Sequence, residues 1–238
     1  MQNSGMKIYI GYDSLQTDAS DVCEYSIHKH SRYDIDVSHL KQQELRDNNL
    51  YWRNDYASTE FSYTRFLIPH LESHNGWAMF CDSDFLFTKD VSVMFNALLK
   101  DKYLDRYSCF VVRHKAYEPK AKTKFFGHNQ EALPKKNWSS LILFNCGHED
   151  CKNLTPLTVN NRTPQWLHRF EWTKDSNIGM LDVRWNWLVG DYPEIPEPWG
   201  IHFTNGGPFN GVHGQDYEDI WYNYFTEMTG LDYKKLQS

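Results

Sequence analysis

The chain has 238 residues, of which 40% are hydrophobic and 24% are charged, and its formal net charge is −6 at pH 7. This acidic balance argues against nucleic-acid binding, which needs a basic surface. No apolar run approaches the roughly 18 residues of a transmembrane helix, and the N-terminus lacks the basic and apolar regions of a signal peptide. We expect a cytoplasmic protein, with residues 1–5 as a leader or a disordered segment and residues 6–238 as a single domain.

The first half of the chain alternates strand and helix patterns. A β-rich run ending at Gly11, a helical pattern and an alternating pattern follow one another within about forty residues, which predicts a parallel sheet. A near-continuous apolar run around Phe80 predicts a strand that is buried on both faces. The expected elements are strands 7–12, 34–40 and 76–85 and helices 20–31, 58–71 and 90–99, with serine caps at Ser20 and Ser58 and a helix end near Pro69.

The second half supplies the rest of an α/β fold with a mixed sheet. We expect strands at 108–114 and 139–146, a short helix at 164–172 and an aromatic helix at 217–229. The long lysine-rich connection 115–136 predicts a functional or mobile loop. The five cysteines show no zinc-like spacing, which favours free thiols in a reducing compartment.

Asp82 and Asp84 stand one residue apart inside the apolar run FCDSDFLF (80–87). Side chains at i and i+2 of an extended segment share a face, so both carboxylates would project together from the end of a central strand. Ligands of open α/β sheets bind at the carboxyl ends of strands, and Mg²⁺ or Mn²⁺ offsets the repulsion of two carboxylates. The alternative is a solvated turn whose aspartate caps the next helix, which the apolar flanks disfavour.

A later motif, IHFTNGGPF (201–209), places His202 shortly before Gly206 and Gly207. A neutral imidazole is a suitable third metal ligand, and adjacent glycines let backbone N–H groups approach phosphate oxygens. Alone, such a histidine is usually structural and such glycines form a turn. Their presence together with Asp82 and Asp84 favours a site for a metal and a phosphate.

Four segments in this order resemble the GT-A-fold nucleotide-sugar glycosyltransferases, in particular the family 8-like group. The resemblance implies a single α/β domain of GT-A type, with a Rossmann-like mixed central sheet flanked by helices. It also implies hexosyl transfer with retention, from a nucleoside-diphosphate sugar such as a UDP-sugar to a glycan or other hydroxyl acceptor, with Mn²⁺ or Mg²⁺ held by Asp82, Asp84 and His202. The segments are IYIGYDS (8–14), STEFSYTRFLIPHL (58–71), MFCDSDFLF (79–87) and IHFTNGGPF (201–209).

The same resemblance implies a set of donor contacts, each of which has a structural alternative. Tyr12 would stack on the base or lie in the core, Asp13 would bind the base or ribose or shape a turn, and Arg65 would reach the donor or form a buried ion pair. The expected nucleotide-sugar contacts are Gly11, Tyr12, Asp13, Arg65, Asp82, Ser83, Trp138, Ser139, Gly206 and Gly207.

The chain departs from the family pattern in two places. The late motif lacks the lysine that often precedes its proline. We interpret the 115–136 loop as an acceptor-side lid that donor binding orders, in which Lys122 or Lys124 either meets the diphosphate instead or is solvated. The family's Asp-Gln pair before the RWNW-like segment is imperfect, and we assign Asp175 to that slot as the catalytic carboxylate, a base or an electrostatic stabiliser. A helix cap or a surface charge is the alternative for Asp175.

Two other functions remain as alternatives. A metal-dependent nucleotidyl- or phosphotransferase would also use carboxylates, but it usually has a Gly-rich phosphate loop after the first strand, which IGYDSLQTD lacks. A non-catalytic sugar-binding protein would use the abundant aromatic residues as stacking platforms. Such a protein would not need Asp82, Asp84 and His202 to converge.

Overall fold

The computed structural model describes residues 7–98, 100, 104–114 and 135–236. The expected leader, and the lid with Lys122 and Lys124 up to residue 134, lie outside this range. The strands are β1 (Lys7–Gly11), β2 (Asp36–Leu40), β3 (Trp77–Cys81), β4 (Phe85–Phe87), β5 (Cys109–Val111), β6 (Leu141–Asn145), β7 (Ile178–Met180), β8 (Trp187–Leu188) and β9 (Gly200–His202). The helices are α1 (Thr17–His30), α2 (Gln42–Asp47), α3 (Ile68–Leu71), α4 (Ser92–Leu98), α5 (Pro156–Asn161), α6 (Pro164–His168), α7 (Glu218–Thr229) and α8 (Tyr233–Leu236).

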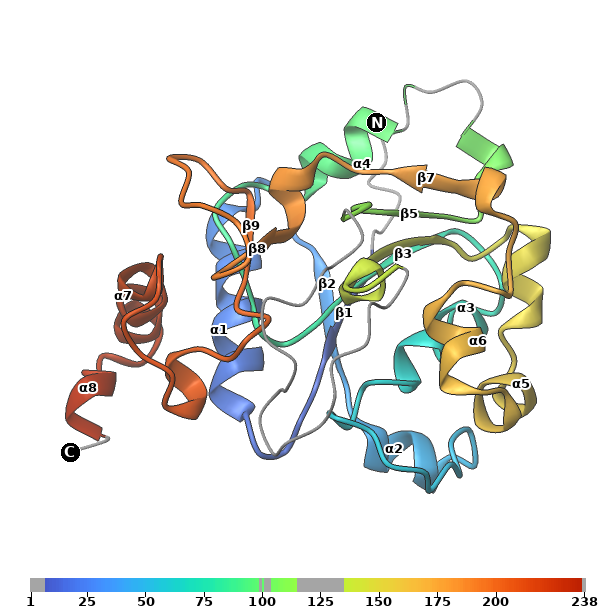
Figure 1. Cartoon of the computed structure of the whole chain (residues 1–238), viewed down its shortest axis with the longest axis horizontal. Coiled ribbons are helices and arrows are strands. Elements are labelled where there is room, and N and C mark those ends of the chain that lie inside the picture. Colours follow the sequence, from blue (N-terminus) through green and yellow to red (C-terminus); the bar gives the residue numbers. More distant parts are fainter. Residues whose placement is uncertain (1–6, 99, 101–103, 115–134, 237–238) are drawn as a thin grey trace.

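The described strands form a mixed six-stranded sheet in the order β2-β1-β3-β6-β5-β7 (Figure 1). β1 is parallel to both β2 and β3, whereas β6 is antiparallel to β3 and β5. The β-α-β start and the central position of the apolar strand around Phe80 are therefore confirmed. The carboxyl ends of β1, β3 and β5 lie at the same edge of the sheet, because all three strands run in the same direction.

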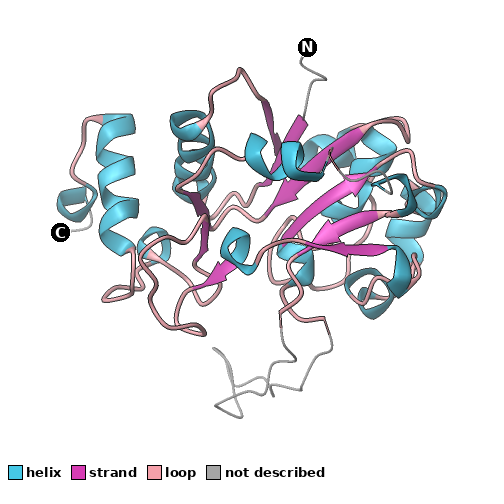
Figure 2. Ribbon diagram, turned by 90° about the horizontal axis from the view of Figure 1, so that it is seen from above, coloured by secondary structure: helices cyan, strands magenta, loops and turns pink. Residues whose placement is uncertain are grey.

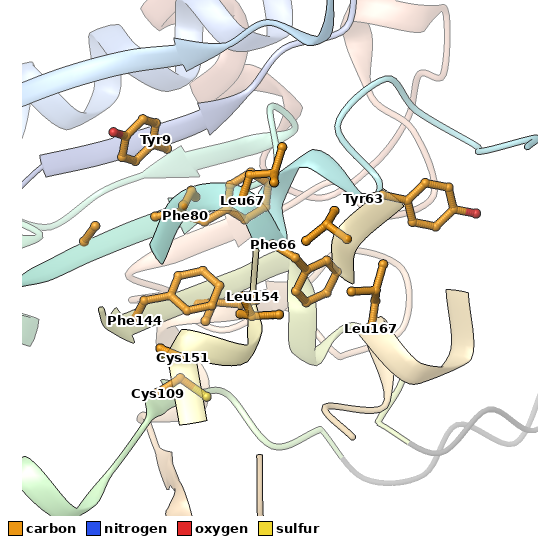
Figure 3. Packing of buried hydrophobic residues seen from close by; sticks show 14 of the residues in the cluster. Tyr9, Tyr63, Phe66, Leu67, Phe80, Cys109, Phe144, Cys151, Leu154 and Leu167 are labelled. Carbon is orange, nitrogen blue, oxygen red and sulfur yellow. The ribbon is translucent and has the colours of Figure 1, made fainter. Parts of the chain in front are cut away.

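The period-two pattern of the strands divides the core into two layers. Alternate residues such as Tyr9, Phe80 and Phe144 face one buried cluster, which also contains Phe66 and Leu167 from the α3 and α6 side of the sheet (Figure 3). Their neighbours in the strands face a second cluster, which also includes residues of α1 and α4. Burial of apolar area on both faces stabilises β3 by about 25 cal/mol per Å². β3 is therefore a firm support for the residues that follow it.

A second sheet, in the order β4-β9-β8, was not expected from the sequence. β4 pairs antiparallel with β9 so that Phe85 lies opposite His202. This small sheet lies between the large sheet and α7 (Figures 1 and 2). Its own apolar cluster includes Leu86, Ile201 and Trp221, with Trp221 on α7. The run 76–85 is therefore not one strand but the end of one sheet, a turn and the beginning of another.

Two expected helix boundaries were wrong. α1 begins at Thr17, because a turn closed by the amide of Gln16 on the carbonyl of Asp13 starts it earlier, and the Ser20 hydroxyl donates back to Thr17 within the helix. In the segment 58–71, a 3₁₀ helix (Thr64–Leu67) precedes α3. Pro69 lies in the first turn of α3, where its missing N–H costs no hydrogen bond, so it starts this helix instead of ending it.

Two further expectations agree with the structure. All five cysteines are buried free thiols. No helix among the described residues has both the length and the apolar character needed to cross a bilayer.

Candidate metal centre and adjoining cavity

Asp82, Asp84 and His202 meet where the two sheets join. Each offers one ligand atom, and these three atoms lie within 4.8 Å of one another. Asp82 follows the last residue of β3, and its amide donates to the carbonyl of Ser140, 2.9 Å away. Asp84 precedes β4, and its carbonyl accepts the amide of Phe203 at 3.0 Å. The backbone thus holds one carboxylate to each sheet and His202 beside them.

The carboxylates converge for a different reason from the one expected. Ser83 and Asp84 form a turn and not an extended segment, so the i, i+2 rule for strands does not apply. Ser83 is 1% exposed and lies inside the turn. Pairing of β4 with β9, which places Phe85 opposite His202, brings the imidazole to the turn. The Phe85 and His202 rings stack at 4.4 Å between centroids, which fixes the plane of the imidazole.

The three side chains have the chemistry of a divalent-cation site. Oδ1 of Asp82 and Oδ1 of Asp84 are both buried without a well-aligned hydrogen bond. Two carboxylate oxygens held together in this way repel each other. A hard divalent cation, which prefers oxygen ligands, would bind both oxygens and neutralise their charges. His202 Nε2 lies 3.3 Å from Asp84 Oδ1. These residues therefore fit Mn²⁺ or Mg²⁺, in agreement with the sequence-based hypothesis.

Asn186 orients the histidine, a role that the sequence analysis missed. Its side chain is 0% exposed, and Oδ1 lies 2.8 Å from His202 Nδ1. Its Nδ2 donates to Ser140 Oγ at 2.8 Å, which fixes the amide orientation. Since Asn186 Oδ1 only accepts, Nδ1 of His202 carries the proton and Nε2 presents its lone pair to the two carboxylates. The only sequence signal was an asparagine within an otherwise aromatic segment, RWNW (184–187).

Arg65 is a buried partner of the metal centre. It is 5% exposed, and Nη1 lies 2.7 Å from Asp82 Oδ1 and 2.7 Å from the carbonyl oxygen of Ser139. Its Nε donates to the carbonyl of Phe61 at 3.2 Å. Burial lowers the pKa of the guanidinium, and the carboxylates of Asp82 and Asp84 oppose that shift. The buried ion pair, left open by the sequence, is therefore present, and it holds Arg65 at the edge of the site.

Burial raises the pKa of the Asp82 carboxyl from 3.8 to about 7, with Arg65 opposing the shift and Asp84 adding to it. Folding therefore favours the protonated form, and this stabilisation is complete below pH 3.8 and lost as the pH rises to about 7. We expect the free energy of unfolding, measured in urea with a chelator present, to fall over this range more steeply in the wild type than in Asp82→Asn. Equal dependence of the unfolding free energy on pH in the two proteins would contradict a raised pKa for Asp82 in the folded state.

A cavity of about 360 Å³ opens beside Asp82. It lies at the carboxyl end of β3, where α/β sheets bind ligands. A larger cavity of about 610 Å³ lies elsewhere, between the segment 194–199 and the start of α7, and contains none of the expected site residues. The cavity beside Asp82 is lined by Ser58, Ser62, Arg65, Asp82, Lys135, Lys136, Asn137, Ser139, Ser140, Pro164, Gln165, His168 and Arg169.

Two histidines near this region, the half-buried His168 and the buried His114, were not singled out in the sequence. His168 lines the cavity and lies 2.9 Å from Ser139 Oγ through Nδ1. Burial, followed by the charges of Arg65 and Arg53, lowers its pKa to about 3. His114 follows β5, and burial and His202 lower its pKa to about 3 as well. Both imidazoles are therefore neutral near pH 7, and the cations of the cavity are its lysines and arginines.

The expected contacts at the end of β1 lie at the same edge of the sheet. A Cβ on Gly11 would lie 2.5 Å from the Phe61 ring, so only glycine allows the segment that carries Arg65 to pack here. Tyr12 stacks on His39 at 5.8 Å between ring centroids. Asp13 Oδ1 accepts the amide of Leu15 at 3.0 Å, and its Oδ2 lies at 3.3 Å from another loop amide. Asp13 therefore shapes the loop after β1, which was its structural alternative.

The two glycines of the late motif differ from expectation. The amide of Gly206 donates to the carbonyl of Phe203 at 2.8 Å, and that of Gly207 donates to Asn210 Oδ1 at 2.9 Å. Both N–H groups are used within the loop, so in this conformation they do not present free donors to a phosphate. Gly206 adopts φ +95°, a conformation that glycine tolerates without strain. Its conformational freedom serves the turn that follows β9.

Trp138 and Ser139 form a 3₁₀ helix, Trp138–Ser140, at the start of β6. Ser139 lines the cavity. The indole nitrogen of Trp138 donates instead to the carbonyl of His114 at 3.3 Å, and Trp138 packs against the core. The Ser139 contact is therefore brought to the site, whereas Trp138 supports the segment from behind.

Asp175 is neither one of the three converging ligands nor one of the residues that line the cavity. It begins a 3₁₀ helix that leads into β7, and its carbonyl accepts from the Arg113 guanidinium at 3.4 Å. Its side chain is 79% exposed and pairs with Lys135 at 2.6 Å. This position is that of the surface charge named as its alternative and does not support a catalytic role.

Comparison with solved structures identifies the fold. The chain superposes on the WbbM bifunctional glycosyltransferase (TM-score 0.66, 15% identity, all of this chain and 53% of that one). It superposes also on apo GlyE of Streptococcus pneumoniae (TM-score 0.60, 16% identity, 98% of this chain and 62% of that one). A third match is the galactosyltransferase LgtC in complex with donor and acceptor sugar analogues (TM-score 0.63, 10% identity, 95% of this chain and 97% of that one). The chain thus spans about half of WbbM and under two thirds of GlyE. At these identities the likeness shows the fold alone, which is the GT-A fold predicted from the sequence.

No family model matches the sequence. A curated relative, Protein CDI of Arabidopsis thaliana, is 40% identical over 240 aligned residues, which cover 98% of this chain and 90% of the relative. Such identity across nearly the full length of both chains means that they share a fold and a common origin. The chain belongs to the family of Protein CDI.

Proposed function

We propose that the protein is a metal-dependent glycosyltransferase that moves a sugar from a nucleoside-diphosphate donor, first of all a UDP-sugar, to a hydroxyl acceptor such as a glycan. The observation that carries the proposal is the convergence of Asp82, Asp84 and His202 within 4.8 Å at the end of the central strand, beside a polar cavity, in a GT-A fold. As the family resemblance implies, we extend the proposal to hexosyl transfer with retention.

Asp82, Asp84 and His202 would hold Mn²⁺ or Mg²⁺. The bound ion neutralises the charge that develops on the leaving diphosphate. Asn186 keeps the lone pair of His202 Nε2 directed at the site through its 2.8 Å contact with Nδ1. Arg65 places a fixed positive charge beside Asp82, which in a site of low dielectric contributes to binding the donor without reorganisation.

The nucleoside would bind at the end of β1, next to β3 in the sheet. The partly exposed Tyr12 ring offers a stacking face for the base beside His39, with Lys41 5.3 Å from its centroid. Gly11 and Asp13 fix the backbone there. The sugar would enter the cavity, whose hydroxyl and amide groups match the hydrogen-bonding pattern of a polyol. Asp175 is not part of this proposal.

The test is ligand-induced thermal stabilisation followed by turnover. With Mn²⁺ present, UDP at about 100 times its Kd is expected to raise Tm by about 5 °C or more, and a chelator should abolish the shift. A panel of UDP-sugars is then assayed for Mn²⁺-dependent release of UDP. If neither UDP nor another nucleoside diphosphate shifts Tm with Mn²⁺ or Mg²⁺, the proposed function is wrong.

A further inference from the structure

The cavity beside Asp82 is cationic, although the chain as a whole carries a net charge of −6. Its lining includes Arg65, Lys135, Lys136 and Arg169, against Asp82 as the one carboxylate among the described lining residues. A concave site lined by one sign of charge concentrates ligands of the opposite sign. The cavity is therefore matched to an anion.

Two of the cationic side chains that line the cavity form ion pairs, whereas no ion pair among the described residues involves Arg169, whose guanidinium is available to bind an anion. Arg65 pairs with Asp82, and Lys135 pairs with Asp175 from outside the lining. Among the residues that the structure describes, no carboxylate lies within 4.0 Å of the Arg169 guanidinium, since every ion pair at that range involves other residues. A guanidinium presents a planar fork of donors that binds a carboxylate through two parallel hydrogen bonds.

The rest of the lining is that of a sugar site. The hydroxyls of Ser139 and Ser140 are already hydrogen-bonded to His168, to the carbonyl of Asn137 and to Asn186. Asn137 and Gln165 add side-chain amides that both donate and accept. A simple phosphate or carboxylate ion would use the cationic groups and leave these amides unmatched. A polyol with one acidic substituent uses both.

We propose that the donor sugar is acidic, a hexuronic acid whose carboxylate binds to the Arg169 guanidinium. This inference rests on the proposed function, because a sugar on the β-phosphate of a donor bound at the Asp82 and Asp84 centre is the first group to reach this cavity. A neutral hexose fills the same polyol contacts but leaves the cationic lining without its anion. Arg169 thus determines specificity for the oxidised C6 position.

The matched probes are UDP-glucuronic acid with UDP-glucose and UDP-galacturonic acid with UDP-galactose, which differ within each pair only at C6. Calorimetric titration of the full chain with Mn²⁺ is expected to show the acidic sugar binding at least about tenfold more tightly in one of the two pairs, as hydrogen bonds to a charged group provide. Arg169→Gln is expected to reduce this ratio to within about threefold.

Arg162→Gln is the matched control. Arg162 lies a few residues earlier on the same segment, stacks on Trp166 at 5.2 Å and does not line the cavity, so the acidic preference should persist. If UDP binds but the neutral sugars bind as tightly as the acidic ones, the inference is wrong while the proposed function stands. A preference that survives Arg169→Gln overturns the role of Arg169. Failure of UDP itself to bind overturns the proposed function and this inference with it.

Discussion

Asp84→Asn is expected to abolish metal-dependent nucleotide binding while leaving the fold intact. Asp84 Oδ1 is buried without a hydrogen-bond partner and lies 3.3 Å from the unprotonated Nε2 of His202, and no described lysine or arginine lies within 4.0 Å of it to neutralise its charge. Replacing even a residue that only orients a metal ligand costs about 10- to 100-fold in affinity, and loss of a ligand should lower Mn²⁺ affinity by more than about 100-fold. Calorimetry with Mn²⁺ measures this directly.

The metal-free stability of the variant distinguishes loss of a ligand from loss of structure. Burial raises the pKa of Asp82, and the charge of Asp84 adds to that shift, so removing one charge should leave the Tm of the metal-free protein unchanged or higher. Asp219→Asn is the control, since that side chain is 87% exposed on α7, and it should bind Mn²⁺ as the wild type does. An Asp84→Asn variant with wild-type Mn²⁺ affinity would exclude the metal centre.

Arg65→Met is expected to cause the largest loss of stability, about 3–5 kcal/mol in the free energy of unfolding. The substitution leaves the Asp82 carboxylate buried without its cation, deprives the carbonyl oxygen of Ser139 of its donor, and removes the Nε–H donor to the carbonyl of Phe61. Urea unfolding at pH 8, above the raised pKa of Asp82, is the measurement, because the carboxylate of the wild type is then ionised in the folded and the unfolded state alike. In the variant the pKa of Asp82 rises further, since Arg65 lowers it in the wild type.

A double-mutant cycle isolates the ion pair. Asp82→Asn added to Arg65→Met should recover part of the loss, because the buried charge disappears with its partner. Arg184→Met is the matched control: Arg184 and its partner Asp182 are each 39% exposed, and such pairs contribute no more than about 1 kcal/mol. A loss of that small size for Arg65→Met would show that Arg65 does not stabilise the centre.

Several elements of the fold follow from local patterns. The strands β1, β3 and β6 are continuous apolar runs, and the helical spacing of α1 and α7 is visible because an amphipathic face repeats along a single element. The Asp-x-Asp pattern could also be interpreted from a short segment, because carboxylates inside an apolar run are costly to bury unless something binds them. His202 was found because its motif resembles one in a known family. These signals lie within short segments and need no knowledge of partners.

Other features depended on which segments meet in space. The turn at Ser83, the small sheet that brings His202 to Asp84, and the Asn186 contact that sets its tautomer all join residues far apart in the sequence. The same holds for the Gly206 and Gly207 amides, which look available in the sequence but are used within their own loop.

Sequence by itself determined the α/β class, the positions of the main strands along the chain and the two carboxylates at the end of β3, since burial periodicity and charge placement are local properties. Only the tertiary structure decided that Arg65 is paired with Asp82, that Asp175 is paired with Lys135 instead of lining the cavity, and that the cavity is cationic. The physical reason is that hydrogen bonds and ion pairs depend on distances between elements, and those distances are set by packing.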